Sequence, residues 1–442
     1  MRPWIRQVAS SGTVPPRVDV AIVGGGIIGC TTAYELAAAG HSVAVFEKGV
    51  VAGEQSGRNW GWVRRQNRAH SELELATLSQ RRWNELGDEL GAELGYRQSG
   101  ILFCTDRESE LARWAKWLEG TIQFGLQSEL LSGPEATRRS GGHNRWHGGI
   151  WSPLDGVAEP SLATSAIAEG AKARGATIHQ GCAVRSLELF AGAVRGVWTE
   201  RGLVTADAVV AAGGAWNGKL CRDVGIQLPV INVEGTTFKT TPTIDLGLPA
   251  ISTPSFALRR RMDGSYNVAV PGYGAVELAP YTIANAARFL PMFRNNVAKR
   301  ISLRVGPGLW LGPDALGKAT NEKPTVFEHI RMMEPKADRA LVRAGLDAMR
   351  EAFSALQGMA VHEAWAGLID TTPDLVPIIS DVATHPGLFI ASGFSGHGFA
   401  LGPGAGRVVA EMVMGQRPSA NLQAFRLSRF TDGSVLQPPG LM

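Results

Sequence analysis

One stretch near the amino terminus constrains the fold more than any other, residues 18–48, which read VDVAIVGGGIIGCTTAYELAAAGHSVAVFEK. An apolar run over 18–23 meets glycines at 24, 25, 26 and 29, a helical pattern follows, and a second apolar run ends at Glu47. Strand, glycine turn, helix and strand in this order predict a βαβ unit with GxGxxG spacing. A glycine-rich turn without a ligand is the alternative, and it leaves the ordered helix, strand and terminal acid unexplained.

Each part of this unit has a physical role in binding a dinucleotide. Gly24 permits the tight turn, Gly26 lets the backbone approach a pyrophosphate, and Gly29 lets helix and strand pack closely. The helix start offers free N–H groups and the positive end of its dipole to the phosphates. Glu47 follows Gly29 by 18 residues, close to the roughly 20 expected for an acid that accepts a hydrogen bond from a ribose hydroxyl.

The length and composition limit the remaining possibilities. At 442 residues the chain is too long for one ordinary core, which predicts two domains or an interleaved pair. The net charge of +4 is too small to indicate a nucleic acid or membrane-surface partner. Cys30, Cys104, Cys182 and Cys221 form neither a CxxC motif nor a metal-type cluster, so we expect no metal site and reduced thiols in a cytoplasmic protein.

The amino-terminal residues show no targeting pattern. Residues 1–16 contain Arg2, Arg6 and adjacent prolines but no apolar core such as a signal peptide needs, so we predict a loose tail. No later segment supplies about 18 consecutive apolar residues, so we expect no membrane-spanning segment.

The rest of the chain alternates between α/β and β-rich patterns. Residues 49–70 are irregular and rich in Gly, Arg, Asn and Trp, which is typical of a ligand-binding loop. An α/β pattern returns over 149–216, and 231–301 is β-rich, with a hairpin turn at Asp263 and Gly264. We therefore predict a first domain from residues 17–70, 149–230 and 360–442 and a second from residues 71–148 and 231–359.

Four segments together resemble the D-amino acid oxidase-like family of FAD-dependent oxidoreductases. They are VAIVGGGIIG with HSVAVFEK, DAVVAAGGAW, WAGLIDTTPDLVPII and GLFIASGFSGHGFALGPGAG, and they span nearly the whole length in the family's order. Within the family, VAGEQSGRN, DVATHPGLFI and GQRPSANLQAFRLSRF are most similar to the bacterial flavoprotein L-amino acid deaminases. Those proteins carry an N-terminal membrane anchor, for which residues 1–16 show no pattern.

The resemblance implies an α/β fold, with a Rossmann-like FAD-binding domain interleaved with a mixed-sheet α+β substrate domain. FAD would bind extended, with its adenine near Val184 and its ring between residues 56–62 and 396–398. Relatives with covalent flavin use a His or Cys that residues 58–62 and 370–374 lack, so the flavin should be non-covalent. The residues expected to bind FAD are Gly24, Gly26, Ile27, Ile28, Gly29, Glu47, Lys48, Glu54, Gln55, Ser56, Gly57, Asn59, Trp60, Gly61, Val184, Ala212, Gly213, Trp216, Gly396, His397, Gly398, Phe399 and Ala400.

The implied reaction is hydride transfer from the Cα of an α-amino acid to flavin N5, after which the imine hydrolyses to a 2-oxo acid and ammonia. We predict an L-amino acid oxidase or deaminase that uses oxygen or another electron acceptor and forms a possible homo-oligomer. The alternative is a D-amino acid, glycine or N-methyl amino acid oxidase or dehydrogenase, because handedness depends on which way the carboxylate anchor faces the ring. A further alternative from another class of protein is a non-catalytic subunit that binds FAD. It would be favoured if the face toward the substrate lacked a buried cation.

A carboxylate is best held by arginine, whose planar fork donates two parallel hydrogen bonds. In the L-amino acid deaminases this arginine lies on the strand after the hairpin, which here reads YNVAVPGYG, with Pro271 or Gly272 in its place. Another arginine must then substitute, and the candidates are Arg259 on the strand before the hairpin and Arg64, next to Arg65, on the ligand loop.

Four further residues are candidates for substrate contact. His397 lies where the family approaches the flavin, Trp62 and Tyr273 are candidates for an aromatic wall, and Glu363 is positioned to meet the substrate amine. A structural histidine, core packing and a salt-bridged carboxylate are the corresponding alternatives.

Overall fold

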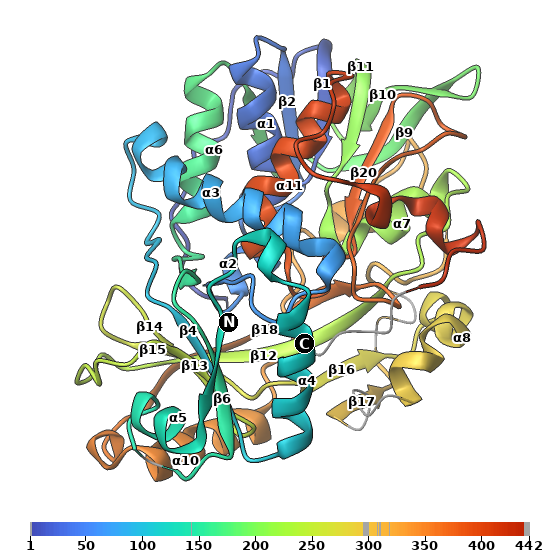
Figure 1. The fold of residues 1–442 in the computed structure, drawn as a ribbon. Coiled ribbons are helices and arrows are strands. Elements are labelled where there is room, and N and C mark those ends of the chain that lie inside the picture. Colours follow the sequence, from blue (N-terminus) through green and yellow to red (C-terminus); the bar gives the residue numbers. More distant parts are fainter. Residues whose placement is uncertain are drawn as a thin grey trace.

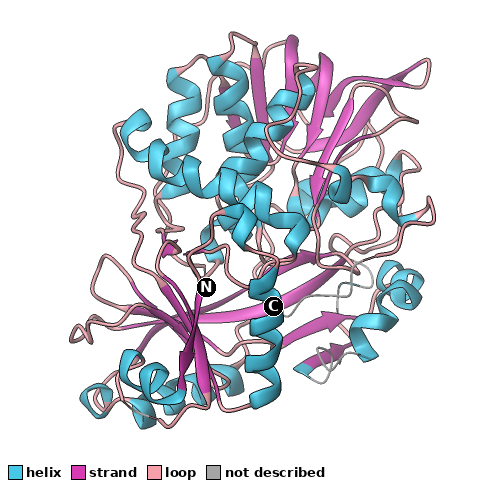
Figure 2. Ribbon diagram, viewed as in Figure 1, coloured by secondary structure: helices cyan, strands magenta, loops and turns pink. Residues whose placement is uncertain are grey.

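Two large sheets lie one above the other in the computed structural model (Figures 1 and 2), which describes residues 2–142, 144–294, 300–306, 308, 311–317 and 319–436. Helices accompany both sheets, and α5 (Gly133–Arg139) and α10 (Arg339–Ala352) lie on the face of the ten-stranded sheet that points away from the eight-stranded one. This mixed α/β architecture agrees with the predicted fold class.

The eight-stranded sheet is built around the predicted first strand. β1 (Arg17–Val23) pairs in parallel with β2 (Val43–Glu47) on one side and with β11 (Gly202–Ala211) on the other. The sheet is completed by β8 (Thr177–Gln180), β9 (Val184–Phe190), β10 (Ala193–Thr199), β19 (Ile378–Asp381) and β20 (Leu388–Ser392). Because parallel strands end at the same edge, the carboxyl ends of β1, β2 and β11 converge on one place.

Three helices cover one face of this sheet, α1 (Ile27–Ala38), α6 (Ala163–Ala173) and α11 (Gly398–Val413), and α3 (Leu73–Leu90) packs against α11 and α6. Helix α1 is buried on all sides, with 10 of its 12 residues inaccessible. Glycines let α11 approach its neighbours closely, because a Cβ on Gly406 would lie 2.5 Å from the Cβ of Thr31 and one on Gly404 2.8 Å from Ser79. The helix that follows the phosphate loop is therefore held rigidly.

The ten-stranded sheet is mixed. Its strands are β17 (Ile301–Arg304), β16 (Gly274–Glu277), β12 (Ile231–Thr240), β15 (Tyr266–Ala269), β14 (Ala257–Arg260), β13 (Ala250–Ser252), β4 (Ile101–Thr105), β6 (Gly148–Ser152), β5 (Glu129–Ser132) and β18 (Val361–Thr371). Around it lie α4 (Glu108–Glu119), α5 (Gly133–Arg139), α8 (Pro280–Arg294) and α10 (Arg339–Ala352). Smaller elements are α2 (Gln55–Arg58), β3 (Trp62–Val63), β7 (Gly156–Val157), α7 (Asn217–Asp223) and α9 (Val326–His329).

The predicted hairpin is present between β14 and β15. Arg261 N donates to Ser265 O at 2.8 Å, and Gly264 adopts the left-handed φ of +80° that the turn requires. The strand signals on both sides of the turn were therefore sufficient to locate this part of the sheet.

The amino-terminal segment corrects the prediction of a loose tail over residues 1–16. Ile5 and Val8 are buried in the core of the eight-stranded layer. Arg6 N donates to Ser161 O at 2.8 Å, and Ser11 N donates to Ile178 O at 2.7 Å. The segment covers the exposed edge of β8, so two isolated apolar residues are enough to fix it where a sheet edge offers backbone partners.

The predicted domain boundaries differ from the observed layers at three places. Helix α3 was assigned to the second domain with residues 71–148, yet Leu75 and Trp83 belong to the same core as α1. Strands β6 and β18 were assigned to the first domain with residues 149–230 and 360–442, but both pair within the ten-stranded sheet. The layer to which a segment belongs is decided by its tertiary pairing and packing, which local sequence patterns do not reveal.

The expectations about membrane-spanning segments and about Cys30 can also be compared with the structure. Among the described residues, no helix combines the length and hydropathy that crossing a bilayer would take. Cys30 is fully buried in the first core, and burial raises the pKa of its thiol, so it is a packing residue.

Candidate active site

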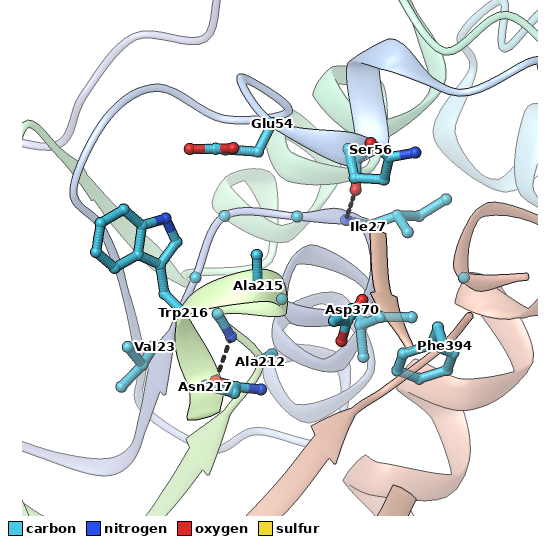
Figure 3. Close-up of a pocket in the computed structure, with 18 of the residues that line it drawn as sticks. Val23, Ile27, Glu54, Ser56, Ala212, Ala215, Trp216, Asn217, Asp370 and Phe394 are labelled. Carbon is cyan, nitrogen blue, oxygen red and sulfur yellow. Dashed lines mark hydrogen bonds between the residues drawn. The ribbon is translucent and has the colours of Figure 1, made fainter. Parts of the chain in front are cut away.

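An elongated cavity of about 1260 Å³, open mouth included, lies at the carboxyl ends of β1, β2 and β11 (Figure 3). Most of the residues predicted to bind the cofactor line it: Gly24, Gly26, Ile27, Ile28, Glu47, Lys48, Glu54, Gln55, Ser56, Asn59, Val184, Ala212, Gly213, Trp216, Gly396, Gly398 and Phe399. We call this the first cavity.

The glycine loop has the geometry that a phosphate cradle needs. Gly24 has φ +110°, and a Cβ there would lie 2.5 Å from Ala212 O, so the loop can pass β11 only as glycine. A Cβ on Gly29 would lie 2.1 Å from Gly24 O. Gly26 lines the cavity, and beside it Ile27 N donates to Ser56 Oγ at 2.9 Å (Figure 3). Gly24 and Gly29 thus shape the loop, and Gly26 leaves the space above it open.

The carboxylate of Glu47 is fixed at the end of β2. It accepts from Gly25 N at 2.8 Å and from Gly49 N at 2.7 Å, and burial raises its pKa. Beside it, Lys48 Nζ donates to Ile330 O at 2.7 Å and lies 4.1 Å from the centre of the Trp216 ring. The oxygens of Glu47 keep further lone pairs with which to accept from a ligand hydroxyl.

The opposite end of the first cavity lies under the start of α11 and the end of β18. Asp370 lines it, accepts from Gly393 N and from Ser392 Oγ at 3.2 Å, and burial raises its pKa to about 6 (Figure 3). The helix α11 directs its amino terminus here, with His397 as N-cap. Its dipole favours negative charge at this place.

A second cavity of about 1250 Å³ continues from the first toward the ten-stranded sheet. Both are lined by Gln55, Asn59, Ile369, Gly396 and Phe399, so they meet at these residues. Aromatic rings form much of the second cavity's wall: Trp60, Trp62, Phe103 and Tyr273. A ligand that fills the first cavity would therefore present one end to an apolar chamber.

Three arginines line this chamber, Arg58, Arg64 and Arg68. The guanidinium of Arg58 already donates to Gly53 O at 3.1 Å and to Met333 O at 2.6 Å, which leaves Arg64 and Arg68 as the pair to consider. Arg68 is only 3% exposed, its Nε donates to Arg64 O at 3.4 Å, and its Nη1 has no hydrogen-bond partner among the described residues. Arg64 is half-buried, and its guanidinium lies 5.5 Å from the centre of the Phe103 ring. Burial lowers the pKa of both side chains, but arginine stays protonated in proteins.

The charges around this pair do not balance. Arg65 lies behind the wall, where its Nε is 3.9 Å from Asp155 Oδ1, and Glu72 is the second carboxylate nearby. Three guanidinium groups therefore face two carboxylates, and burial raises the pKa of Asp155, which weakens its compensation. At least one buried positive charge has no protein counter-ion in this cluster, so it favours binding of an anion.

Four of the six predicted substrate-contacting residues line the second cavity: Arg64, His397, Trp62 and Tyr273. The other two nominations are corrected. Arg259 Nη1 lies 2.8 Å from Glu159 Oε1, and its Nε donates to Trp60 O, so its fork already holds a protein carboxylate. Glu363 lies 3.9 Å from Lys239 Nζ across the β12–β18 pair and lines neither cavity.

Six predicted cofactor residues lie outside the first cavity. Trp60 and His397 line the second one instead. Gly29, Gly57 and Gly61 lie behind the wall, where a Cβ would meet Gly24 O, Ala52 O and the Arg259 side chain, respectively. The carbonyl of Ala400 accepts from Trp83 Nε1 at 3.0 Å, inside the helical layer. These four are structural positions, with Gly29 in α1, Gly57 in α2, Gly61 just before β3 and Ala400 in α11.

Sequence reasoning missed Arg68, Glu72 and Asp370. Arg68 lies at the end of the irregular stretch and Glu72 just after it, four residues apart and before α3, which is a weak signal for one charged face. Asp370 lay inside a segment used only for family resemblance. Neither signal indicates that the side chains point into a cavity.

The glycine cradle, the acid at the end of β2 and the adjoining chamber define a dinucleotide-binding oxidoreductase. The chain belongs to the FAD dependent oxidoreductase family, abbreviated DAO, whose model matches residues 19–412. FAD is therefore its cofactor. The residues that line the first cavity fit FAD. Gly26 has no side chain to occupy the cavity, and the buried Trp216 Nε1 and Gln55 Oε1 on the wall lack hydrogen-bond partners among the described residues.

The relatives differ in the amines that their names specify. Glycine oxidase of Bacillus licheniformis is 26% identical over 93% of this chain and 98% of its own length. D-amino acid dehydrogenase of Rhizobium rhizogenes is 25% identical over 93% of this chain and all of its own. Human mitochondrial sarcosine dehydrogenase is 24% identical over 95% of this chain, which spans only 42% of that protein.

Among solved structures, L-amino acid deaminase from Proteus myxofaciens, in complex with anthranilate, superposes with a TM-score of 0.90 at 27% identity, covering 98% of each chain. The L-amino acid deaminase from Proteus vulgaris gives 0.89 at 26% identity, covering 97% of this chain and all of that one. The described part of this chain thus follows one known architecture over nearly all of its length.

Proposed function

We propose that this chain oxidises L-amino acids with neutral side chains to 2-oxo acids and ammonia, using FAD. The observation that carries the proposal is the uncompensated buried charge of Arg64 and Arg68 on the wall of the second cavity. A monocarboxylate brought there supplies the missing counter-charge and accepts the unpartnered N–H of Arg68.

The position of the cluster relates the carboxylate to the oxidised carbon. Arg64 and Arg68 line the chamber into which the cofactor cavity opens at Gly396 and Asn59. If these arginines bind the carboxylate of the substrate, its Cα lies between them and that opening. Fixed placement of this kind removes much of the entropic part of the barrier.

The remaining wall fits an apolar side chain. Trp60, Trp62, Phe103 and Tyr273 offer rings and no charge, and Trp60 Nε1 is already used by Thr237 Oγ1 at 3.0 Å. Aromatic walls bury an apolar side chain favourably and exclude water from the reacting carbon. These four rings offer no cation to a second carboxylate in the substrate.

When bound, FAD supplies the acceptor for the electron pair that leaves the Cα–H bond. The chain's contribution is to hold the substrate, exclude water and stabilise negative charge at the start of α11, where His397 and Gly398 begin a helix of 16 residues. Release of the imine into water gives the 2-oxo acid and ammonia.

The L configuration is supported by similarity alone, through the Proteus deaminases. Glycine, sarcosine and D-amino acids are the substrates that the other relatives' names favour. Anaerobic mixing of the yellow holoenzyme with each class separates these possibilities, because only a substrate bleaches the flavin.

The anchor is tested with L-phenylalanine and with phenethylamine, which lacks the carboxylate. Arg68→Met should lower kcat/KM for L-phenylalanine by about 30-fold to 1000-fold, the equivalent of about 2–4 kcal/mol, without lowering it for phenethylamine. Arg195→Met, at an exposed position, is the control. If Arg64→Met and Arg68→Met both retain the wild-type preference for the carboxylate, the proposed anchor is wrong.

A further inference from the structure

A buried histidine and a buried glutamate meet beside the arginine pair. Glu72 lies just before α3 and is 1% exposed, and His397 caps α11 and is 7% exposed. His397 Nδ1 and Glu72 Oε1 are 3.0 Å apart, although 325 residues separate them in the chain. The second oxygen of Glu72 accepts from Ala69 N at 3.3 Å.

The contact fixes which nitrogen of His397 carries the proton. Although burial alone would raise it, the hydrogen bond from His397 and the positive charge of Arg68 hold the pKa of Glu72 below its usual value, so Glu72 is an acceptor only. Nδ1 must then be the N–H that donates to it, and Nε2 carries the lone pair. Nε2 makes no hydrogen bond to any described residue, and His397 lines the second cavity.

His397 is neutral in the free protein. Burial, together with the positive charges of Arg68 and Arg64, lowers its pKa to about 4, against which Glu72 pulls in the other direction. Among the described residues that line the second cavity, the other titratable groups are Arg58, Arg64, Arg68 and Tyr273. None of these offers a basic lone pair near neutral pH.

The proposed reaction needs such a base. An amino acid binds chiefly as its ammonium form near neutral pH, and the nitrogen must have a free electron pair before a C=N bond can form. One N–H bond therefore has to break, with its electron pair left on nitrogen and its proton transferred to an acceptor in the chamber.

We propose that Nε2 of His397 accepts this proton and that Glu72 is a positioning residue that holds the ring in the required tautomer. The inference rests on the proposed function, because it needs an amine substrate in the second cavity. The transfer balances as ammonium plus neutral imidazole giving amine plus imidazolium, with the imidazolium paired to Glu72.

Substrate binding itself favours the transfer. The empty site keeps His397 neutral partly through Arg64 and Arg68. A carboxylate that binds these two arginines cancels their positive charge and so removes part of the repulsion against an imidazolium. The same anion that anchors the substrate thereby makes the base stronger when it is needed.

The first test follows flavin bleaching by L-phenylalanine under anaerobic conditions from pH 6 to pH 10. His397→Asn should lower the rate at pH 7 by about 100-fold or more, the usual contribution of a general base. The loss should shrink at high pH, as the ammonium group of the substrate ionises without help. A purely structural role would lower the rate at every pH alike.

Benzoate, a carboxylate without an amine, reports the anchor separately. Its dissociation constant, read from the flavin spectrum, should change less than about threefold in His397→Asn and rise in Arg68→Met. His385→Asn is the matched control, since His385 lies near the β19–β20 turn and lines neither cavity. A His397→Asn protein that binds benzoate is folded, so a lost rate then reflects the chemistry.

The tautomer is measured without turnover by nitrogen NMR of holoenzyme labelled at histidine, with His397 assigned as the signal missing in His397→Asn. We expect a protonated Nδ1 and an unprotonated Nε2, and Glu72→Gln should abolish this preference and lower the rate at pH 7, with Glu72→Asp restoring part of both. If His397→Asn oxidises L-phenylalanine at an unchanged rate and with an unchanged pH profile, the proposed roles of His397 and Glu72 are wrong, while the proposed function stands. If neither L-phenylalanine nor glycine bleaches the flavin, the proposed roles of His397 and Glu72 and the proposed function are both wrong.

Discussion

The two cavities that meet at Gly396 are built in different ways. The phosphate end of the first is shaped by backbone from one local motif, where Gly24, Gly26 and Glu47 lie within a single βαβ unit. The second is lined by side chains from several segments far apart in the chain, among them Arg68 and Tyr273. A site made from consecutive backbone can be recognised by spacing, whereas one made from distant side chains depends on tertiary pairing.

The largest effect should come from filling the glycine-lined end of the first cavity. Gly26 has φ −78° and a Cβ there would meet only Ser56 Oγ at 3.2 Å, so Gly26→Val is compatible with the fold, but its methyl groups enter the cavity. We expect purified Gly26→Val to lack flavin absorbance near about 450 nm and not to regain it with added FAD. Absorbance and far-UV circular dichroism measure the two properties.

The control is Gly87→Val in α3, where the nearest atom to an added Cβ is Ala92 O at 3.8 Å. This variant should retain its yellow colour. A yellow Gly26→Val protein would show that the first cavity is not where the pyrophosphate binds, and the contrast between the two cavities would then lose its basis.

The extent to which the sequence predicts the molecule follows the same contrast. The βαβ unit and the β14–β15 hairpin follow from glycine spacing and apolar runs, whereas most of the lining of the first cavity was expected only from the family resemblance. The choice between Arg259 and Arg64 does not, because both lie in plausible places and only the pairing of Arg259 with Glu159 distinguishes them. Burial and partners of a charge are properties of the folded chain.

Arg259→Met tests this reinterpretation and should have the second largest effect. It removes a 1% exposed guanidinium that joins Glu159 to the carbonyl of Trp60. We expect the free energy of unfolding to fall by about 3 kcal/mol, the lower end for a broken buried pair, because Arg261 still reaches Glu159 at 3.1 Å. Urea unfolding of the holoenzyme measures this loss.

The neighbouring Arg260 provides a matched control on the other face of β14. It pairs with the exposed Asp245 at 3.3 Å, so Arg260→Met should cost no more than about 1 kcal/mol. If Arg259→Met instead leaves stability unchanged and weakens binding of benzoate, Arg259 belongs to the substrate-side cavity, as its sequence position first suggested.

Asp370 shows that the first cavity also contains a side chain that spacing could not find. Its usual pKa of 3.8 is raised to about 6 by burial. Between these values the folded state holds a proton that the unfolded state has lost, so this contribution to stability is complete below pH 3.8 and disappears as the pH rises through 6. From pH 4.5 to pH 7.5 the loss amounts to about 2 kcal/mol.

Asp370→Asn keeps an oxygen for Gly393 N–H and removes the titration. The wild type should therefore lose about 2 kcal/mol more than Asp370→Asn between pH 4.5 and pH 7.5 in urea unfolding of the FAD-free protein. His397 has the opposite sign, because its lowered pKa costs stability as the pH falls from 6.5 toward 4, but it is present in both proteins and cancels. Parallel pH profiles would contradict a buried ionising Asp370.

The smallest effect should come from Glu363, the carboxylate that the sequence offered for the substrate amine. Its oxygen lies 3.9 Å from Lys239 Nζ on the neighbouring strand, beyond the range of a hydrogen bond, and the residue lines neither cavity. Glu363→Gln should change the free energy of unfolding by less than about 1 kcal/mol and leave the rate of flavin bleaching by L-phenylalanine unaltered. A rate loss of about tenfold or more in this variant would place a carboxylate at the amine and remove the need for His397 as the proton acceptor.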